Sequence, residues 1–243
     1  MTVFQRGDDI IKRSKRDLII CFLGPDGSGK TTLSELLLKD LKEMGFSPLR
    51  VWWLSGDDSI VRRMLKKLRG INEGEEGVSS SSKQAYSMKG RLADKLFRTW
   101  FPRIVLMDYL RFGIALTSKQ RIQRKNDILI LDRYYYDVIA SISWEFEFSE
   151  VRRKNYLKLF SALLPSPDIF FIIRVSPETS LARKSTEIRS LGFAKENSMK
   201  HESIISYVSS RYPDRSMEID NTGKLESARE EVLRKTLALT QMT

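Results

Sequence analysis

The residues whose types and spacing most clearly point to chemistry form a glycine-rich loop near the start of the chain. The segment Gly24–Thr31 reads GPDGSGKT and fits the phosphate-binding pattern G-x-x-x-x-G-K-[ST]. Such a loop, the P-loop, turns its backbone N–H groups toward phosphate oxygens, and the helix that begins at its end favours anions. We expect Lys30 to reach the β- and γ-phosphates of ATP and the Thr31 hydroxyl to bind Mg²⁺. The residues expected to bind the nucleotide are Gly24, Asp26, Gly27, Ser28, Gly29, Lys30, Thr31 and Thr32.

A second candidate site follows the apolar segment Asp127–Leu131, which is typical of a buried strand. Asp132 and Arg133 come directly after this segment. An acid at that place can hold the Mg²⁺ shell, and an arginine beside it would face the phosphates from the far side of the crevice. The alternative is that Asp132 caps a helix and that the following tyrosines belong to the core.

The elements that must position these residues alternate between apolar strands and helices. Strands are expected at Asp17–Leu23, Leu49–Leu54, Asp127–Leu131, Asp168–Val175 and Ser216–Ile219. Helices are expected at Thr31–Met44, Leu92–Gln123 with an interruption near Pro102, Val151–Leu164, Pro177–Ser190, Glu196–Ser210 and Ser227–Thr240. This alternation predicts an α/β fold of the P-loop NTPase type, a three-layer sandwich with a five-stranded parallel sheet and helices on both faces. Ligands of such sheets bind at the carboxyl ends of the strands, where both candidate sites lie.

Two motifs, GPDGSGKTT and LDRYYYD, resemble those of the thymidylate kinase family of P-loop nucleoside monophosphate kinases. The segments RVSPETSLARK and SMEIDNTGKLESAREEV are similar to later parts of that family, so the resemblance covers most of the chain from Asp17 onward. It implies an ATP- and Mg²⁺-dependent transfer of the γ-phosphoryl group to a nucleoside monophosphate, with dTMP converted to dTDP. It also implies a nucleotide partner and a homodimer, the common state in that family.

The resemblance also implies roles for single residues. Asp26 matches a carboxylate near the acceptor sugar, Arg133 an arginine near the phosphates, and Arg111 an arginine that approaches the acceptor phosphate. Phe112 or Tyr109 could line the base pocket, and Asn221 falls in the loop on the adenine side. Arg183, Lys184 and Arg189 fall where the family's lid, here about 183–200, supplies cations, although a solvated helix face is the alternative. The expected catalytic residues are Lys30, Asp132, Arg133 and Arg183, with Thr31 and Asp132 as metal ligands.

The acceptor side departs from the family pattern at two places. The segment after the second strand reads WWLSGDD, and Asp137 occupies a position where the family carries a serine. A carboxylate facing an acceptor phosphate would repel it. If the acceptor were instead a hydroxyl, a base would be needed, and Asp137 or Asp26 would be a candidate. A kinase of a sugar or another small hydroxyl compound is therefore the second hypothesis, and an ATPase that binds nucleic acid is the third.

Composition sets limits on these hypotheses. The 243 residues, of which 41% are hydrophobic, suit a single domain with a variable insertion at about 55–100. The net charge is +11, but the basic residues are dispersed and match no nucleic-acid-binding motif, so nucleic acid is not expected as a partner. We find no apolar stretch typical of a membrane span or of a secretory signal at the start, and therefore expect a cytoplasmic location. Cys21 is expected in the core, and His201, in a polar helix, is expected at the surface or in a helix-lining role.

Overall fold

The computed structural model describes residues 18–52, 99–115, 127–183 and 190–242. The strands are β1 (Leu18–Leu23), β2 (Pro48–Trp52), β3 (Ile128–Asp132), β4 (Ile169–Arg174) and β5 (Ser216–Asp220). The helices are α1 (Lys30–Glu43), α4 (Tyr135–Glu145), α5 (Glu150–Leu163), α6 (Pro177–Arg183), α7 (Leu191–Arg211), the 3₁₀ turn η1 (Pro213–Arg215) and α8 (Leu225–Met242). Residues 99–115 form a further helix.

The five strands form one parallel sheet in the order β2-β3-β1-β4-β5. This confirms the predicted α/β fold with a five-stranded parallel sheet. The central strand β1 pairs with β3 on one side and β4 on the other, so that Cys21 lies opposite Leu131 and Phe170. Cys21 is fully buried, as its apolar neighbours predict.

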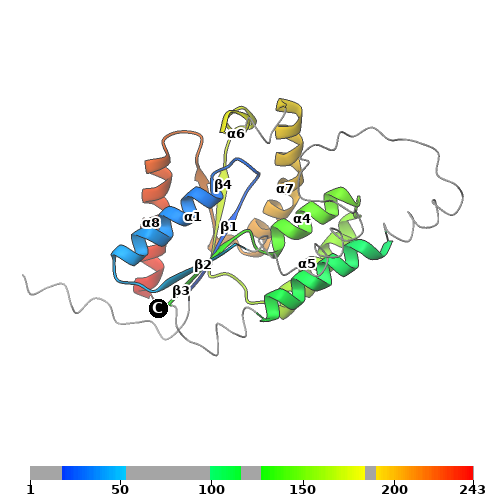
Figure 1. Ribbon diagram of the computed structural model, residues 1–243, viewed down its shortest axis with the longest axis horizontal. Helices are drawn as coiled ribbons and strands as arrows, with labels where there is room; N and C mark the ends of the chain where they lie inside the picture. The colour runs from blue at the N-terminus through cyan, green and yellow to red at the C-terminus, as the bar shows by residue number, and fades with distance from the viewer. Residues whose placement is uncertain (1–17, 53–98, 116–126, 184–189, 243) are drawn as a thin grey trace, which may run out of the picture.

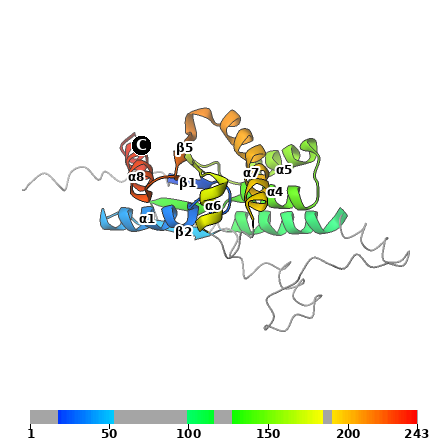
Figure 2. The ribbon, with the colours of Figure 1, turned by 90° about the horizontal axis from the view of Figure 1, so that it is seen from above.

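Helices cover both faces of the sheet, and each face has its own core. Along β1, Ile20 and Phe22 pack with α1 and α8, whereas Cys21 and Leu23 pack with the other helical layer. Successive side chains of a strand point to opposite faces, which is why a strand buried on both sides is apolar throughout. Figures 1 and 2 show α1 and α8 on one side of the strands, and α4, α5, α7 and the helix 99–115 on the other.

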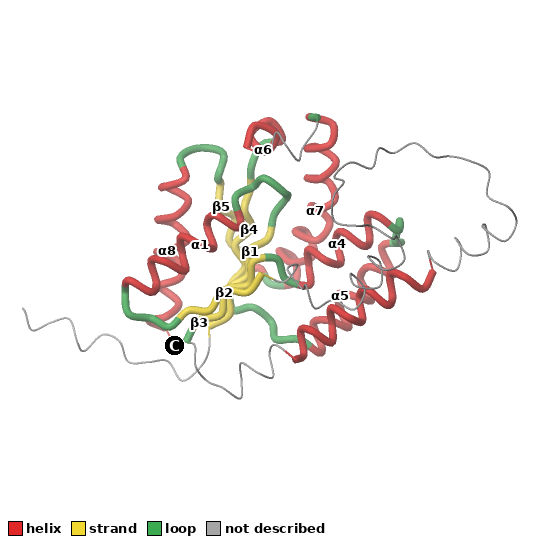
Figure 3. Tube along the Cα trace, viewed as in Figure 1, coloured by secondary structure: helices red, strands yellow, loops and turns green. Residues whose placement is uncertain are grey.

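The carboxyl ends of the parallel strands meet at one edge, and this edge positions the candidate site. The loop from β1 into α1, the end of β3, the start of α6 after β4 and the turn from β5 into α8 all lie there. In Figure 3 the strands stand together in the centre, with α6 and the turn between β5 and α8 above them.

Several boundaries differ from the sequence-based expectations. The described part of the helix that starts at Pro177 runs to Arg183, and the next helix begins at Leu191 rather than Glu196. Within the described helix 99–115 no interruption occurs at Pro102, contrary to the sequence-based expectation. Most of the expected insertion at 55–100 and part of the expected lid, residues 184–189, fall outside the described residues. Among the helices that the structure describes, none has both the length and the hydropathy needed to cross a membrane.

Candidate active site

The glycine loop adopts a backbone conformation that residues with a Cβ atom could not adopt at the same positions. Gly27 and Gly29 have φ angles of 81° and 91°, in the left-handed region that favours glycine. A Cβ atom on Gly27 would lie 2.6 Å from Ser180 Oγ, and one on Gly29 would collide with Asn221 Nδ2. The glycines therefore allow both a sharp turn and the close approach of two neighbouring elements.

Lys30 is buried at the start of α1 and is bonded to its own loop. Its Nζ donates to the carbonyl oxygens of Gly24 at 2.5 Å and Pro25 at 2.7 Å. Burial lowers the pKa of Lys30, although the carboxylate of Asp137 partly counteracts this effect. The ammonium group lies beside a cavity of about 280 Å³ that is lined by Gly27, Gly29, Lys30, Thr31, Thr32, Arg133 and Arg183. The structure thus brings three of the predicted phosphate-binding cations, Lys30, Arg133 and Arg183, around one cavity.

Asp26 and Arg133 form an ion pair that joins the P-loop to the end of β3. Arg133 Nη2 donates to Asp26 Oδ1 at 2.6 Å. Burial alone would raise the pKa of Asp26, but the charges of Lys30 and Arg133 outweigh it and hold this pKa below its ordinary value. Arg133 has a φ of 63°, which is unusual for a residue other than glycine and turns its side chain back across the strand ends.

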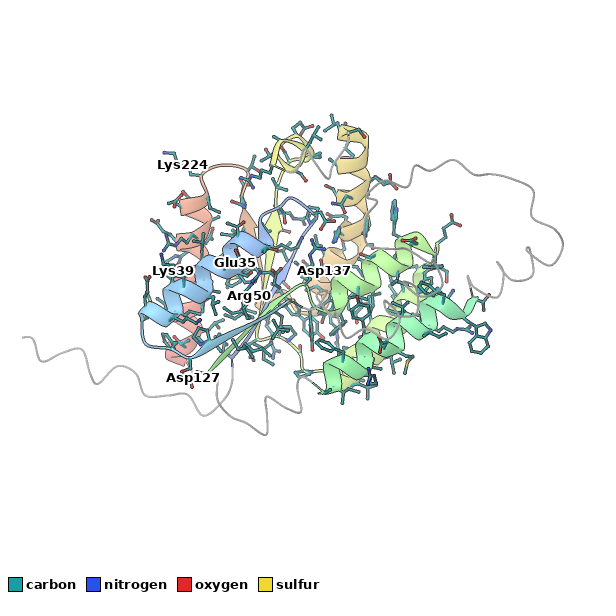
Figure 4. All side chains as sticks on the ribbon, in the orientation of Figure 1. Glu35, Lys39, Arg50, Asp127, Asp137 and Lys224 are labelled. Atoms are coloured by element: carbon teal, nitrogen blue, oxygen red, sulfur yellow. The ribbon has the colours of Figure 1, made fainter. Side chains whose placement is uncertain are left out.

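Asp132, the expected metal ligand, is fully buried and paired with an arginine that no sequence motif indicates. Arg50 Nη2 on β2 donates to Asp132 Oδ2 at 2.6 Å, and Arg50 Nε donates to Ser34 Oγ at 2.8 Å. Arg50 also forms an ion pair with Glu35 on α1 at 3.1 Å, and the two residues are labelled in Figure 4. One oxygen of Asp132 is thereby held in place.

The other oxygen of Asp132 suits a metal ion. Oδ1 is buried and has no hydrogen-bond partner within the part of the chain that the structure describes. The Ser34 hydroxyl lies 3.4 Å from Asp132 Oδ2 and donates to the carbonyl of Thr31 at 2.9 Å, which links the carboxylate to the predicted metal-binding threonine. Carboxylate and hydroxyl oxygens are the ligands that Mg²⁺ prefers, so these residues fit a Mg²⁺ held together with nucleotide phosphates.

A second polar pair lies on the sheet face covered by α4 and α7. Asp137, in the first turn of α4, is 3% exposed, and His201 on α7 is 5% exposed. The two contact each other at 3.5 Å between Oδ1 and Nε2, and His201 Nδ1 lies 2.8 Å from the carbonyl of Asn197. Because that carbonyl can only accept, Nδ1 donates to it and Nε2 faces the carboxylate of Asp137. Oδ2 of Asp137 has no hydrogen-bond partner among the residues described.

This pair acts electrostatically on the P-loop. The charge of Asp137 is the strongest factor opposing the effect of burial on the pKa of Lys30, and His201 is among the charges that lower the pKa of Asp26. His201 is therefore not at the surface, one of its two expected places, but buried within reach of the candidate site. Its position in a polar helix gave no sign of this.

The remaining predicted residues lie in different surroundings. Arg111 is 65% exposed and contacts Asp108 on its own helix at 3.3 Å, while Phe112 packs against the core on that side of the sheet. Asn221 is buried beneath the P-loop, where its Nδ2 donates to the carbonyl of Ser28 at 2.8 Å. Lys184 and Arg189 lie outside the described residues, as do Trp53 and the segment that follows it. The acceptor roles of Arg111 and Phe112 and the adenine-side role of Asn221 stay predictions.

The parallel sheet, the glycine loop at the carboxyl end of β1 and the acid at the end of β3 define a P-loop NTPase. Comparison with protein families specifies which one: the model of the KAP family P-loop domain matches residues 8–181, and the chain belongs to that family.

Two other known proteins are similar to the chain. It is 26% identical, over 167 residues that make up 68% of each protein, to a probable thymidylate kinase of Archaeoglobus fulgidus. The fold is shared with the crystal structure of thymidylate kinase from Ehrlichia chaffeensis, with a TM-score of 0.52 and 19% identity, covering 90% of this chain and 98% of that one. The sequence comparison therefore confirms the resemblance to thymidylate kinases that the motifs indicate, and the structural comparison confirms the shared fold.

Proposed function

We propose that this protein is an ATP-dependent phosphotransferase whose acceptor is a nucleoside monophosphate, with dTMP as the first candidate. The observation that carries the proposal is the convergence of Lys30, Arg133 and Arg183 on the cavity at the P-loop. Phosphoryl transfer depends mainly on positioning and on neutralising the charge that spreads over the transferred group. Cations on several sides of one phosphate-sized space meet that requirement.

Each residue has a specific part in this transfer. The backbone N–H groups of the P-loop bind the phosphates, and Lys30 leaves its loop carbonyls to contact the β- and γ-oxygens. Arg133 and Arg183 approach the γ-phosphoryl group from the far side of the cavity. Thr31 and Asp132 would hold Mg²⁺, which supplies further positive charge to the phosphate oxygens when it is bound.

The support for dTMP comes from the relatives, whose names describe them as thymidylate kinases. A phosphate acceptor is already an anionic nucleophile, so the reaction needs no general base. Asp26 would contact the acceptor sugar, and Arg111 and Phe112 would bind its phosphate and base, as the resemblance implies.

A small hydroxyl compound, such as a sugar, is the second candidate acceptor. The observation that favours it is the buried Asp137, whose charge acts on Lys30 and whose Oδ2 has no partner among the described residues. A carboxylate placed there could take the proton from an attacking hydroxyl, with His201 holding its other oxygen.

A product screen tests the proposal and separates the two acceptors. The purified chain is incubated with Mg²⁺, γ-³²P-labelled ATP and a panel of nucleoside monophosphates, nucleosides and sugars, and labelled products are separated by chromatography. Rapid label transfer to dTMP alone would support the first candidate and eliminate the second. Label on a sugar or nucleoside hydroxyl, without label on dTMP, would support the second candidate and eliminate the first. ATP hydrolysis that is stimulated by nucleic acid, without any phosphorylated acceptor, would overturn both and favour an ATPase.

We also propose that the chain forms a homodimer. Trp100, Ile104 and Met107 are spaced so that they share one face of the helix 99–115, and they are 56%, 49% and 51% exposed. An apolar face of this kind commonly marks a contact surface. Light scattering should give a mass of twice the 28.2 kDa chain. A monomer at micromolar concentration would contradict this proposal and leave the proposed reaction unaffected.

A further inference from the structure

Two buried side chains from separate elements bond to carbonyl groups of the P-loop. Ser180 on α6 donates from Oγ to the carbonyl of Asp26 at 2.6 Å. Asn221, in the turn that follows β5, donates from Nδ2 to the carbonyl of Ser28 at 2.8 Å. Both residues are 1% exposed, and neither is among the residues that line the cavity at the P-loop. They therefore contact the loop without lining that cavity.

The direction of these carbonyl groups matters for phosphate binding. An anion-binding loop must turn its N–H groups inward, so some of its carbonyl groups must point outward. A buried carbonyl without a donor costs free energy, and a carbonyl that faced the cavity would repel phosphate oxygens. Hydrogen-bond donors on neighbouring elements remove this conflict. Ser180 donates to the carbonyl of Asp26, and Asn221 donates to the carbonyl of Ser28, two residues further along the loop.

The fit between these side chains and the glycines is close. The space that a Cβ of Gly27 would fill is taken by Ser180, and the space at Gly29 is taken by Asn221. Arg183 Nη1 would lie 3.9 Å from a Cβ on Gly29. Because Ser180 and Arg183 belong to the same short helix, the bond from Ser180 also ties the helix that carries Arg183 to the loop.

The buried amide of Asn221 lowers the stability of the fold, and its hydrogen bond to the loop explains why an amide is nevertheless present. Its Oδ1 is buried and finds no hydrogen-bond partner in the described ranges of the chain. A buried carbonyl oxygen left in this way destabilises the fold. An apolar side chain of similar shape would avoid that cost, but it could not donate to Ser28.

We propose that Ser180 and Asn221 are positioning residues that together form a clasp, holding the P-loop in its phosphate-binding conformation. The clasp preorganises the loop, so that bound phosphates meet N–H groups that already point inward. This inference depends on nucleotide binding by the P-loop and not on the identity of the acceptor.

The test compares nucleotide affinity with stability in matched variants. Ser180→Ala and Asn221→Leu each remove one donor to the loop. Thr236→Val is the control, because Thr236 is equally buried and donates to the carbonyl of Val232 within α8, away from the P-loop. ADP affinity is measured by isothermal titration calorimetry, and stability by thermal unfolding.

Each clasp variant should weaken ADP binding about three- to tenfold, the range expected for one hydrogen bond. Asn221→Leu should do so with little loss of stability, or with a gain, whereas Thr236→Val should lower stability and leave ADP affinity unchanged. If transfer activity is present, the KM for ATP should rise while the KM for the acceptor stays the same.

ADP affinity within twofold of the original chain in both clasp variants would overturn the inference. The inference would also be overturned if Thr236→Val weakened ADP binding as much as the clasp variants do, because lost stability alone would then explain the weaker binding. If Ser180→Ala or Asn221→Leu does not fold, the milder Ser180→Cys and Asn221→Ser replace them, with the same expected order of affinities. Absence of any phosphorylated product would count against the proposed function alone, because ADP binding is measured without an acceptor.

Discussion

Lys30 is the residue on which the phosphate site depends most. It is buried, it lines the cavity, and its ammonium can exchange two loop carbonyls for phosphate oxygens. Lys30→Ala should abolish phosphoryl transfer while the chain still folds and unfolds cooperatively, because the substitution removes a phosphate ligand and leaves both hydrophobic cores unchanged. Turnover and thermal unfolding measured on the same preparation check this. Retained turnover would contradict the assignment of the P-loop.

The ion pair between Asp26 and Arg133 makes stability depend on pH. In the folded chain the pKa of Asp26 lies below its ordinary value, since the charges of Lys30 and Arg133 outweigh the effect of burial. The charged form therefore stabilises the fold above the unfolded pKa of about 3.9, and this contribution is lost as the pH falls through the lower folded value.

The variant Asp26→Asn isolates this contribution. Its unfolding temperature should be lower than that of the original chain near pH 6, and the difference should shrink as the pH falls below about 3.9. Thermal unfolding of both proteins across that range is the measurement. A difference that is constant with pH would show that the charge of Asp26 does not contribute.

A single substitution at Asp137 distinguishes between the two candidate acceptors, a nucleoside monophosphate and a small hydroxyl compound. If the acceptor is dTMP, Asp137→Asn should preserve kcat, because a phosphate acceptor needs no general base, and a lower KM for dTMP would indicate that the carboxylate faces the acceptor phosphate. If Asp137 is instead the base for a hydroxyl acceptor, kcat should fall by about 10² to 10⁴. Steady-state kinetics give both parameters. His201→Gln, which keeps a polar side chain, is a matched variant that tests whether the partner of Asp137 contributes.

At the scale of elements, the contact between β2 and β3 holds the predicted metal ligand. Arg50 on β2 is the partner of the fully buried Asp132 at the end of β3. Arg50→Met should cost about 3–5 kcal/mol of unfolding free energy, because it leaves a carboxylate buried and unpaired. Urea denaturation measures this cost. A loss below about 1 kcal/mol would mean that Asp132 finds another partner.

The strands and the loops at their carboxyl ends could be predicted from sequence, because a buried parallel strand is a short apolar segment and the P-loop has a fixed spacing. The residues that contact these loops from other elements could not be predicted from sequence. Arg50 looked like an ordinary polar residue in LRVWWL, and Ser180 like an ordinary helix residue. Their roles depend on the strand order β2-β3-β1-β4-β5, which brings residues far apart in sequence to one edge. The burial of His201 could not be predicted for the same reason, since the contact between α7 and α4 has no local signature.

At the scale of the whole molecule, the sheet is shared by two cores. Leu37 on α1 is buried in one, and Ile139 on α4 is buried in the other. Leu37→Ala and Ile139→Ala should each destabilise the chain by about 2–5 kcal/mol. Because both cores use the same strands, each variant should still unfold in a single transition. Calorimetry tests this, and two separate transitions would mean that the layers unfold independently.

The bonds from Lys30 to Gly24 and Pro25 have a consequence for the strength of ligand binding. They act as an intramolecular competitor, because every incoming nucleotide must displace two carbonyl oxygens before it gains the ammonium. An anionic phosphate oxygen accepts a stronger hydrogen bond from an ammonium group than a neutral carbonyl does. The exchange therefore favours anionic ligands, and a neutral group that met Lys30 would gain nothing over the two carbonyls already bonded to it.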